Sequence, residues 1–145
     1  MNDAQWFREN RLDNSQPNLV NPDGDSALML AARQGRAELL RDLIARGVDV
    51  HVLDSYGNNA VWAACYAESE VCIRDLIGAG CDPDYRNPAG NTVMAYAASS
   101  GKDAVVHLLL ELGADPNIAN DDDMTPLDLA ASLTSFKLLR AVCAA

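Results

Sequence analysis

The sequence predicts an all-α solenoid, in which one helix-turn-helix unit repeats along the chain. The first observation is a period of 33 residues, because the 145 residues stack in rows of 33 without a gap. The second observation is that glycine recurs in fixed columns of these rows: Gly24, Gly57 and Gly90 in one, and Gly47, Gly80 and Gly113 in another. A fixed period of this length is typical of proteins whose structural units stack on their neighbours.

Each row opens with a turn and the start of a helix. Asp, Asn and Gly concentrate in the turn, as turn chemistry favours. The residue at the end of the turn is one that can accept a hydrogen bond from a free helix N–H and act as an N-cap. These residues are Ser26, Asn59, Thr92 and Thr125. A short first helix rich in Ala follows, and Gly35 or Gly101 ends it in rows one and three.

Each row closes with a second helix. Its apolar residues recur at i, i+1, i+4 and i+5, which makes one buried stripe; in row one these are Leu39, Leu40, Leu43 and Ile44. The glycine of the second column then supplies the left-handed residue that ends a helix. Pro83 and Pro116 come three residues later, where no helix can continue.

Three stretches resemble the ankyrin-repeat family: D54-S-Y-G-N-N-A, T125-P-L-D-L-A-A131 and L108-L-L-E-L-G-A-D-P-N117. The resemblance covers residues 21 to 145 closely. It implies an L-shaped stack of antiparallel helix pairs with β-hairpin-like fingers. It also implies a domain that holds other proteins on a concave surface made by the finger tips and the first, inner helices.

The resemblance sets the domain boundaries. We expect an N-terminal capping half-repeat over residues 1–20, repeats over 21–53, 54–86 and 87–119, and a truncated C-terminal capping repeat over 120–145. Trp6 and Phe7 would shield the first apolar face, since a repeat cannot bury its face alone. Glu68 replaces the mid-repeat glycine of repeat two, Thr134 that of repeat four, and Asp123 replaces a finger glycine. We therefore expect an altered helix-to-helix turn at Glu68 and a less regular finger at Asp123.

The composition limits the class of partner. A net charge of −10 disfavours nucleic acid and anionic membrane surfaces, and favours solubility and a basic protein partner. The N-terminus lacks a secretory signal and no run reaches the ~18 apolar residues of a membrane span. We therefore expect a cytoplasmic protein with reduced thiols, a disulfide or reactive thiol being the alternative. Polar outer helices, as at Arg41, Asp42 and Arg46, favour a monomer.

Aromatic residues gather at repeat two and its border with repeat three. Trp and Tyr are enriched at the centres of protein interfaces, because they supply a large contact area at low entropic cost. We hypothesise that the centre of a protein-binding face consists of Tyr56, Trp62, Tyr66, Tyr85 and Arg86. The alternative, strongest for Trp62 and open also for Tyr66, Tyr85 and Tyr56, is a packing role, in which Trp62 fills space beneath the fingers. Tyr96 shares a column with Leu30, Ala63 and Leu129 and is expected in the core.

Acidic residues are the second candidate for a binding site. They crowd the first and last fingers: Asp23, Asp25, Asp121, Asp122 and Asp123. A basic partner could meet both ends, and the charge would speed its encounter. The alternative is a solvated turn in which Asp is favoured by turn chemistry. A calcium site is less favoured, because the regular acidic spacing and late Glu of a calcium loop are missing.

No arrangement in the sequence indicates an enzyme or a cofactor. His51 and His107 fall far apart in the repeat, no Ser, Cys or Lys has a positioned base, and no phosphate-binding glycine loop is present. Cys65, Cys72 and Cys143 occupy core columns, while the setting of Cys81 is less clear.

The sequence therefore predicts a non-enzymatic protein-binding module. Its small size and acidity favour an inhibitor or immunity-type neutraliser of one basic partner. An adaptor that joins two proteins is the alternative, and a metal-dependent protein that uses Asp121, Asp122 and Asp123 is a further one.

Overall fold

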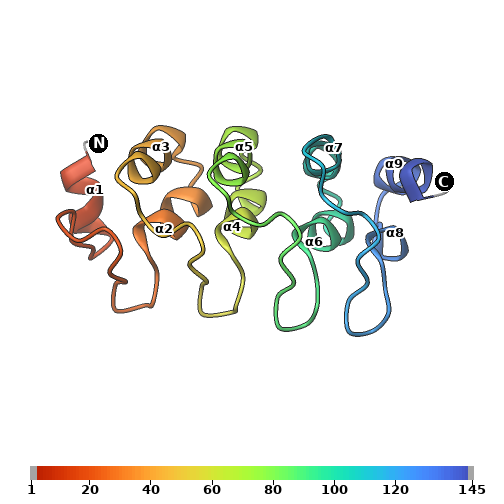
Figure 1. Cartoon of the computed structure of the whole chain (residues 1–145), viewed down its shortest axis with the longest axis horizontal. Helices are drawn as coiled ribbons and strands as arrows, with labels where there is room; N and C mark the ends of the chain where they lie inside the picture. The colour runs from red at the N-terminus through yellow and green to blue at the C-terminus, as the bar shows by residue number, and fades with distance from the viewer. Residues whose placement is uncertain (1–2, 144–145) are drawn as a thin grey trace. The chain divides into compact units, whose positions relative to one another are not determined.

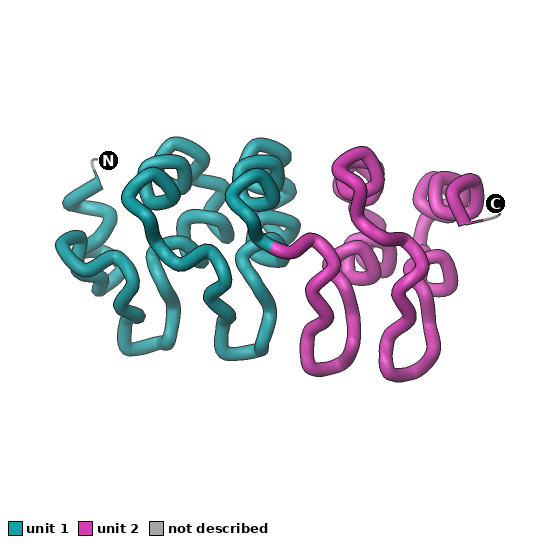
Figure 2. The backbone as a smooth tube through the Cα atoms, viewed as in Figure 1, with its two compact units in different colours: residues 1–81 teal, residues 82–145 magenta. Residues whose placement is uncertain are grey.

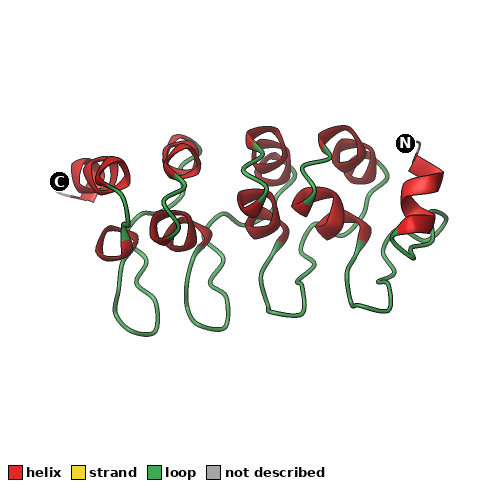
Figure 3. Ribbon diagram, turned by 180° about the vertical axis from the view of Figure 1, so that it is seen from behind, coloured by secondary structure: helices red, strands yellow, loops and turns green. Residues whose placement is uncertain are grey.

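A computed structural model describes residues 3–143 of the chain. Within this range the chain forms helices and loops, and the only strand-like pairing is an isolated antiparallel bridge between Leu53 and Asn59 (Figure 3). The predicted all-α class is confirmed. The loops that were expected to resemble β-hairpins are fingers, here defined as residues 21–25, 54–58, 87–91 and 120–124. In each finger the first N–H donates to the carbonyl of the last residue over 2.9 Å.

The chain divides into two compact units, residues 1–81 and residues 82–145 (Figure 2). Unit 1 contains α1 (Asp3–Glu9), α2 (Ala27–Arg33), α3 (Ala37–Ala45), α4 (Ala60–Tyr66) and α5 (Glu70–Gly78). Unit 2 contains α6 (Val93–Ser99), α7 (Asp103–Glu111), α8 (Pro126–Leu129) and α9 (Leu133–Cys143). The division falls inside repeat two as the sequence defines it, after its second helix and before the next finger.

Unit 1 is two layers of helices with the fingers on the far side (Figure 1). The inner helices α2 and α4 pack on each other, and the outer helices α3 and α5 lie above them. Helix α1 covers the first face. Its Trp6 and Phe7 are buried, with their rings edge to face at 5.2 Å, and the Trp6 indole N–H donates to Gln34 over 2.7 Å. The burial of both rings agrees with the shielding role expected of Trp6 and Phe7.

Unit 2 repeats the two layers, with α6 and α8 inside and α7 and α9 outside. In its last helix pair the inner helix α8 is shortened to four residues, and the turn between the two helices comes earlier than the Thr134 position expected from the repeat. Helix α8 ends at Leu129 because Ala130 leaves the helical conformation, with ψ at 118°. Helix α9 then starts at Leu133, so Thr134 lies in the first turn of a helix and not in the turn between two helices.

The predicted N-caps are all present. Each accepts a hydrogen bond from the backbone N–H three residues later: Ser26 from Met29, Asn59 from Trp62, Thr92 from Ala95 and Thr125 from Asp128. At Thr125 the Asp128 carboxylate also accepts from the cap backbone, which completes a capping box. These caps satisfy helix N–H groups that would otherwise lack partners.

Two expectations about irregular turns are wrong. Glu68 adopts φ of 54°, close to the 67° and 69° of Gly35 and Gly101, and makes the same turn hydrogen bonds. Asp123 adopts φ of 61°, and its N–H donates to Asn120 as the finger glycines donate to the first residues of their fingers. The backbone therefore imposes the left-handed conformation at both positions, although neither residue is glycine.

Four cysteines are free. Cys65, Cys72 and Cys81 are buried and Cys143 is half-buried. Burial raises the pKa of the Cys72 and Cys143 thiols, which keeps them in the less reactive protonated form. Residues 3–143 include no helix with the length and apolar character to cross a bilayer.

The terminal repeat is anchored on α7 by one carboxylate. Asp103, the first residue of α7, accepts hydrogen bonds from the hydroxyls of Ser132 and Ser135, the latter over 2.6 Å. Ser132 immediately precedes α9, and Ser135 lies in its first turn and is fully buried. The Ser132 bond, followed by the Ser135 bond, lowers the pKa of Asp103.

The Glu68 position yields a stability prediction. A non-glycine residue in the left-handed region destabilises the folded state by roughly 1–2 kcal/mol. Glycine removes this strain, but part of the gain is lost because glycine makes the unfolded chain more flexible. We expect Glu68→Gly to raise the free energy of unfolding in urea by about 0.5–1 kcal/mol. Asp123→Gly should raise the free energy of unfolding by less, because Asp tolerates the left-handed conformation better than Glu does. A Glu68→Ala protein with an equal gain would contradict the account, since alanine keeps the strain.

Asp103 yields a prediction on acid stability. Because its pKa is lower in the folded protein than in the unfolded chain, its contribution is complete above about pH 5 and is lost as the pH falls through the folded-state pKa. Urea unfolding of wild type and Asp103→Asn should differ at pH 7 and converge towards pH 2. A difference that stays constant over this range would show that the carboxylate charge has no part in anchoring α9.

Candidate functional site

Tyr56 stands at the tip of the second finger of unit 1. Its side chain is 80% exposed, while its backbone N–H donates to the Asp54 carboxylate over 2.8 Å. The same carboxylate accepts from the Asn58 N–H over 3.0 Å. The finger backbone is therefore held by its own first residue, and the aromatic ring is presented to solvent on a rigid loop.

Helix α4 carries the two other predicted aromatic residues of unit 1. Tyr66, the last residue of the helix, is 64% exposed. Trp62 is half-buried, one turn earlier. This burial decides neither for a space-filling role of Trp62 nor for a role in a binding surface, and both stay predictions. Tyr56 and Tyr66 are thus the most exposed of the large hydrophobic residues described in unit 1.

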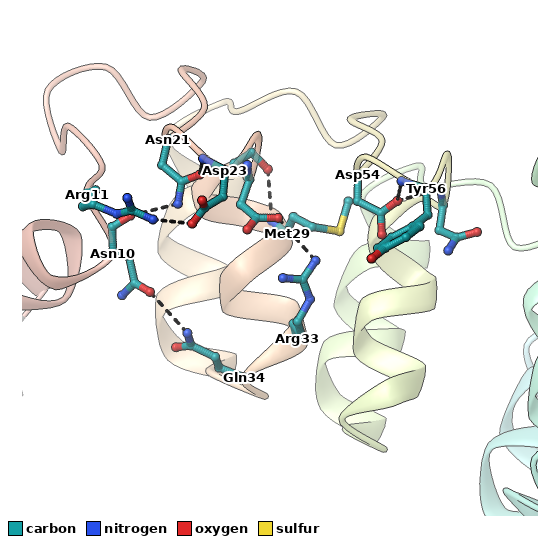
Figure 4. Close-up of polar contacts among 12 residues, drawn as sticks. Asn10, Arg11, Asn21, Asp23, Met29, Arg33, Gln34, Asp54 and Tyr56 are labelled. Atoms are coloured by element: carbon teal, nitrogen blue, oxygen red, sulfur yellow. Dashed lines mark hydrogen bonds and ion pairs between the residues drawn. The ribbon is translucent and has the colours of Figure 1, made fainter.

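The acidic residues of the first finger are paired within the chain (Figure 4). Arg11 donates to Asp23, and Arg33 lies 3.4 Å from Asp25. The Met29 side chain, one repeat before Trp62, points toward the finger that carries Tyr56 (Figure 4). Asp23 and Asp25 therefore offer a basic partner less free charge than the sequence suggested. Sequence reasoning missed both arginines, and only their small sequence separations from the finger could have indicated them.

Arg86 has a structural position in unit 2. Its guanidinium donates to the carbonyls of Gly90 and Ala119 over 3.0 and 3.2 Å, and to Asp121 over 3.3 Å. It thereby ties the finger 87–91 to the finger 120–124. Tyr85 beside it is half-buried. Arg86 is thus engaged on three sides, although 49% of its side chain stays exposed.

Gly90 lies directly against the contact between Arg86 and Asp121. A Cβ at Gly90 would lie 2.4 Å from Asp121 Oδ1 and 2.7 Å from Arg86 Nη2, and the residue has φ of 80°. Gly24 has a similar φ of 83°, but a Cβ there would meet nothing within 4 Å. The two glycines therefore separate the cost of the backbone conformation from the cost of a steric clash.

The last finger does not assemble a metal site. Asp121 pairs with Arg86, and the Asp122 and Asp123 side chains are exposed. Within residues 3–143 no three His, Cys, Asp or Glu side chains gather where they could hold a metal ion. The alternative of a metal-dependent protein based on these three residues has no geometric support.

The predicted site residues fall into two sets. Unit 1 contains Tyr56, Trp62, Tyr66, Asp23 and Asp25, and unit 2 contains Tyr85, Arg86, Asp121, Asp122 and Asp123. The aromatic face of unit 1 is hereafter Tyr56, Trp62 and Tyr66. Tyr96, which we expected in the core, is half-buried.

The contrast between the two glycines gives a prediction. Gly24→Ala should cost about 1–2 kcal/mol of unfolding free energy through backbone strain alone. Gly90→Ala should cost about 1 kcal/mol more, because it also breaks the Arg86–Asp121 pair. Urea unfolding would measure both. The excess should vanish in an Arg86→Ala, Asp121→Ala background, and an excess that persists there would assign it to another contact.

Comparison with known proteins agrees with the fold. The model of a family described as ankyrin repeats (3 copies) matches residues 4–87 and 61–145. No curated protein matched the sequence. Ankyrin repeats are generally protein–protein interaction modules and not enzymes.

Proposed function

The chain belongs to the ankyrin-repeat family, and we propose that it acts by binding another protein through the aromatic face of unit 1. The observation that carries this proposal is the exposure of two tyrosines, 80% at Tyr56 and 64% at Tyr66, on a capped helix and the finger that precedes it. A finger tip and an inner helix of one repeat thus each present an exposed aromatic ring.

The local structure supports a binding role over a packing role for these tyrosines. The finger backbone is closed by the Asp54 carboxylate, and α4 is capped by Asn59 and packed on α2, so neither ring is needed to fold the repeat. A tyrosine on a pre-ordered element loses little further entropy when it is buried by a partner. Such residues are typical of interface hot spots.

The net negative charge of the chain favours rapid association with a basic partner. It contributes less to the contacts within the complex. The net charge of −10 speeds the approach of a cation. Within the fingers, however, Asp23, Asp25 and Asp121 already face arginines. We therefore propose that salt slows association with the partner and changes its dissociation little.

A single aromatic face fits an inhibitor or neutraliser of one partner. An adaptor would need a second binding surface. The stoichiometry of the isolated complex distinguishes these functions: one partner species for an inhibitor, two for an adaptor.

Truncation of the exposed tyrosines tests the proposal. A Tyr56→Ala, Tyr66→Ala protein should keep the helical circular dichroism of the wild type and bind the partner at least ~100-fold more weakly, about 2.7 kcal/mol. The partner is first captured from a lysate of the cells that make the protein, and the affinity is then measured by calorimetry.

The matched control is Val71→Ala. Val71 is 41% exposed in the same repeat but lies on the outer helix α5, so its loss should leave affinity unchanged. A partner held equally by wild type and the folded double variant would move the binding site away from these tyrosines.

A further inference from the structure

Helix α9 of unit 2 exposes one side that is both apolar and basic. Leu133, Phe136, Lys137 and Arg140 are spaced i, i+3, i+4 and i+7, and all four are exposed, Leu133 by 66% and Phe136 by 38%. We call these four residues the α9 stripe. The opposite side of the helix packs on α7 and α8 through the buried Ser135 and Leu139. The stripe is therefore not needed to hold α9 in place.

The charge of the stripe differs from that of the chain. The protein has 11 Lys and Arg against 21 Asp and Glu. Arg11, Arg33, Arg41, Arg74 and Arg86 are paired with carboxylates. Among residues 3–143 no carboxylate pairs with Lys137 or Arg140; instead the Arg140 guanidinium lies over the Phe136 ring, 5.9 Å from its centre. Cation and aromatic ring thus form one continuous ridge.

One contact in unit 1 shows what a cation in this column can meet when a helix stacks beside it, although Arg74 of the same column pairs with Glu70 of its own helix. Arg140 lies three periods of 33 residues after Arg41. In unit 1, Arg41 of α3 donates to Asp75 of the neighbouring outer helix α5 over 2.7 Å. Arg140 thus occupies the same repeat position as Arg41, whose side chain contacts an acidic residue of an adjacent helix.

We infer that the α9 stripe is a docking surface for an amphipathic helix of another protein, one with acidic residues beside an apolar face. The stripe spans about 11 Å, two turns of helix, which suits ridge-into-groove packing of a second helix. Leu133 and Phe136 would meet the apolar face, and Lys137 and Arg140 the carboxylates.

Two other occupants fit less well. A second copy that met the stripe with its own stripe would place Lys137 and Arg140 against like charges, which is unfavourable. An anionic membrane would have to accept a chain with a net charge of −10. The acidic helix matches both the cations and the apolar residues.

The probe is a fluorescein-labelled synthetic peptide of about 21 residues, long enough to be helical, with leucines on one face and glutamates beside them. A second peptide has lysine in place of every glutamate. Fluorescence anisotropy measures the binding of each to the full chain, to Lys137→Glu, Arg140→Glu and to Phe136→Ser. Arg8→Glu, an exposed charge reversal on α1, is the matched control, and circular dichroism checks the fold of every variant.

We expect the acidic peptide to bind wild type and the Arg8→Glu protein equally, and to bind the double charge reversal and Phe136→Ser at least 10-fold more weakly. The lysine peptide should prefer the double reversal. Equal binding of the acidic peptide to wild type and to the double reversal would overturn the inference. A concentration-dependent dimer lost in Phe136→Ser would overturn it in favour of a second copy. Tighter binding of wild type to phosphatidylglycerol vesicles than to the acidic peptide would overturn it in favour of a membrane.

Discussion

Every described helix of this protein is too short to be stable alone. The longest, α9, has 11 residues, and isolated helices below about 12–15 residues are marginal in water. Each helix therefore depends on a neighbour for its apolar side, and α2, α4, α5, α6 and α8 also depend on a side-chain cap at their start. This constraint explains the repeat itself, because a unit that cannot bury its own face must be followed by another of the same shape. It also explains why the two large aromatic residues of α1, Trp6 and Phe7, are buried.

The same constraint explains which features could be predicted from the sequence. Caps and left-handed turn residues act over three or four residues, so Ser26, Thr92 and Gly47 could be assigned from local chemistry alone. Glu68 and Asp123 were misjudged because the backbone hydrogen bonds of the helix-to-helix turn and of the finger hold the left-handed conformation, whatever residue occupies it. A residue type indicates a preferred conformation, but the neighbouring packing determines the conformation that is adopted.

The charged contacts could not be predicted. Arg86 meets Asp121 across 35 residues of sequence, and Arg41 meets Asp75 across 34. Such pairs depend on side-chain conformations that a repeat period does not specify. The Arg86–Asp121 pair matters for function because it partly neutralises a finger carboxylate that looked available. The exposure of Tyr56 and Tyr66 agrees with the hypothesis that both belong to a protein-binding face.

The two candidate surfaces lie in different units and differ in chemistry. The aromatic face of unit 1 presents rings on a finger and an inner helix, whereas the α9 stripe presents cations and apolar side chains on an outer helix. If only the first is used, the protein binds one partner, as an inhibitor does. If both are used, it joins two proteins.

The central claim is that a partner contacts unit 1 at Tyr56. A photo-reactive benzoylphenylalanine placed at position 56, and at position 71 on the outer helix of the same repeat, tests it most directly. The account predicts a cross-link to the partner from position 56 and none from position 71. A cross-link from position 71 without one from position 56 would contradict it.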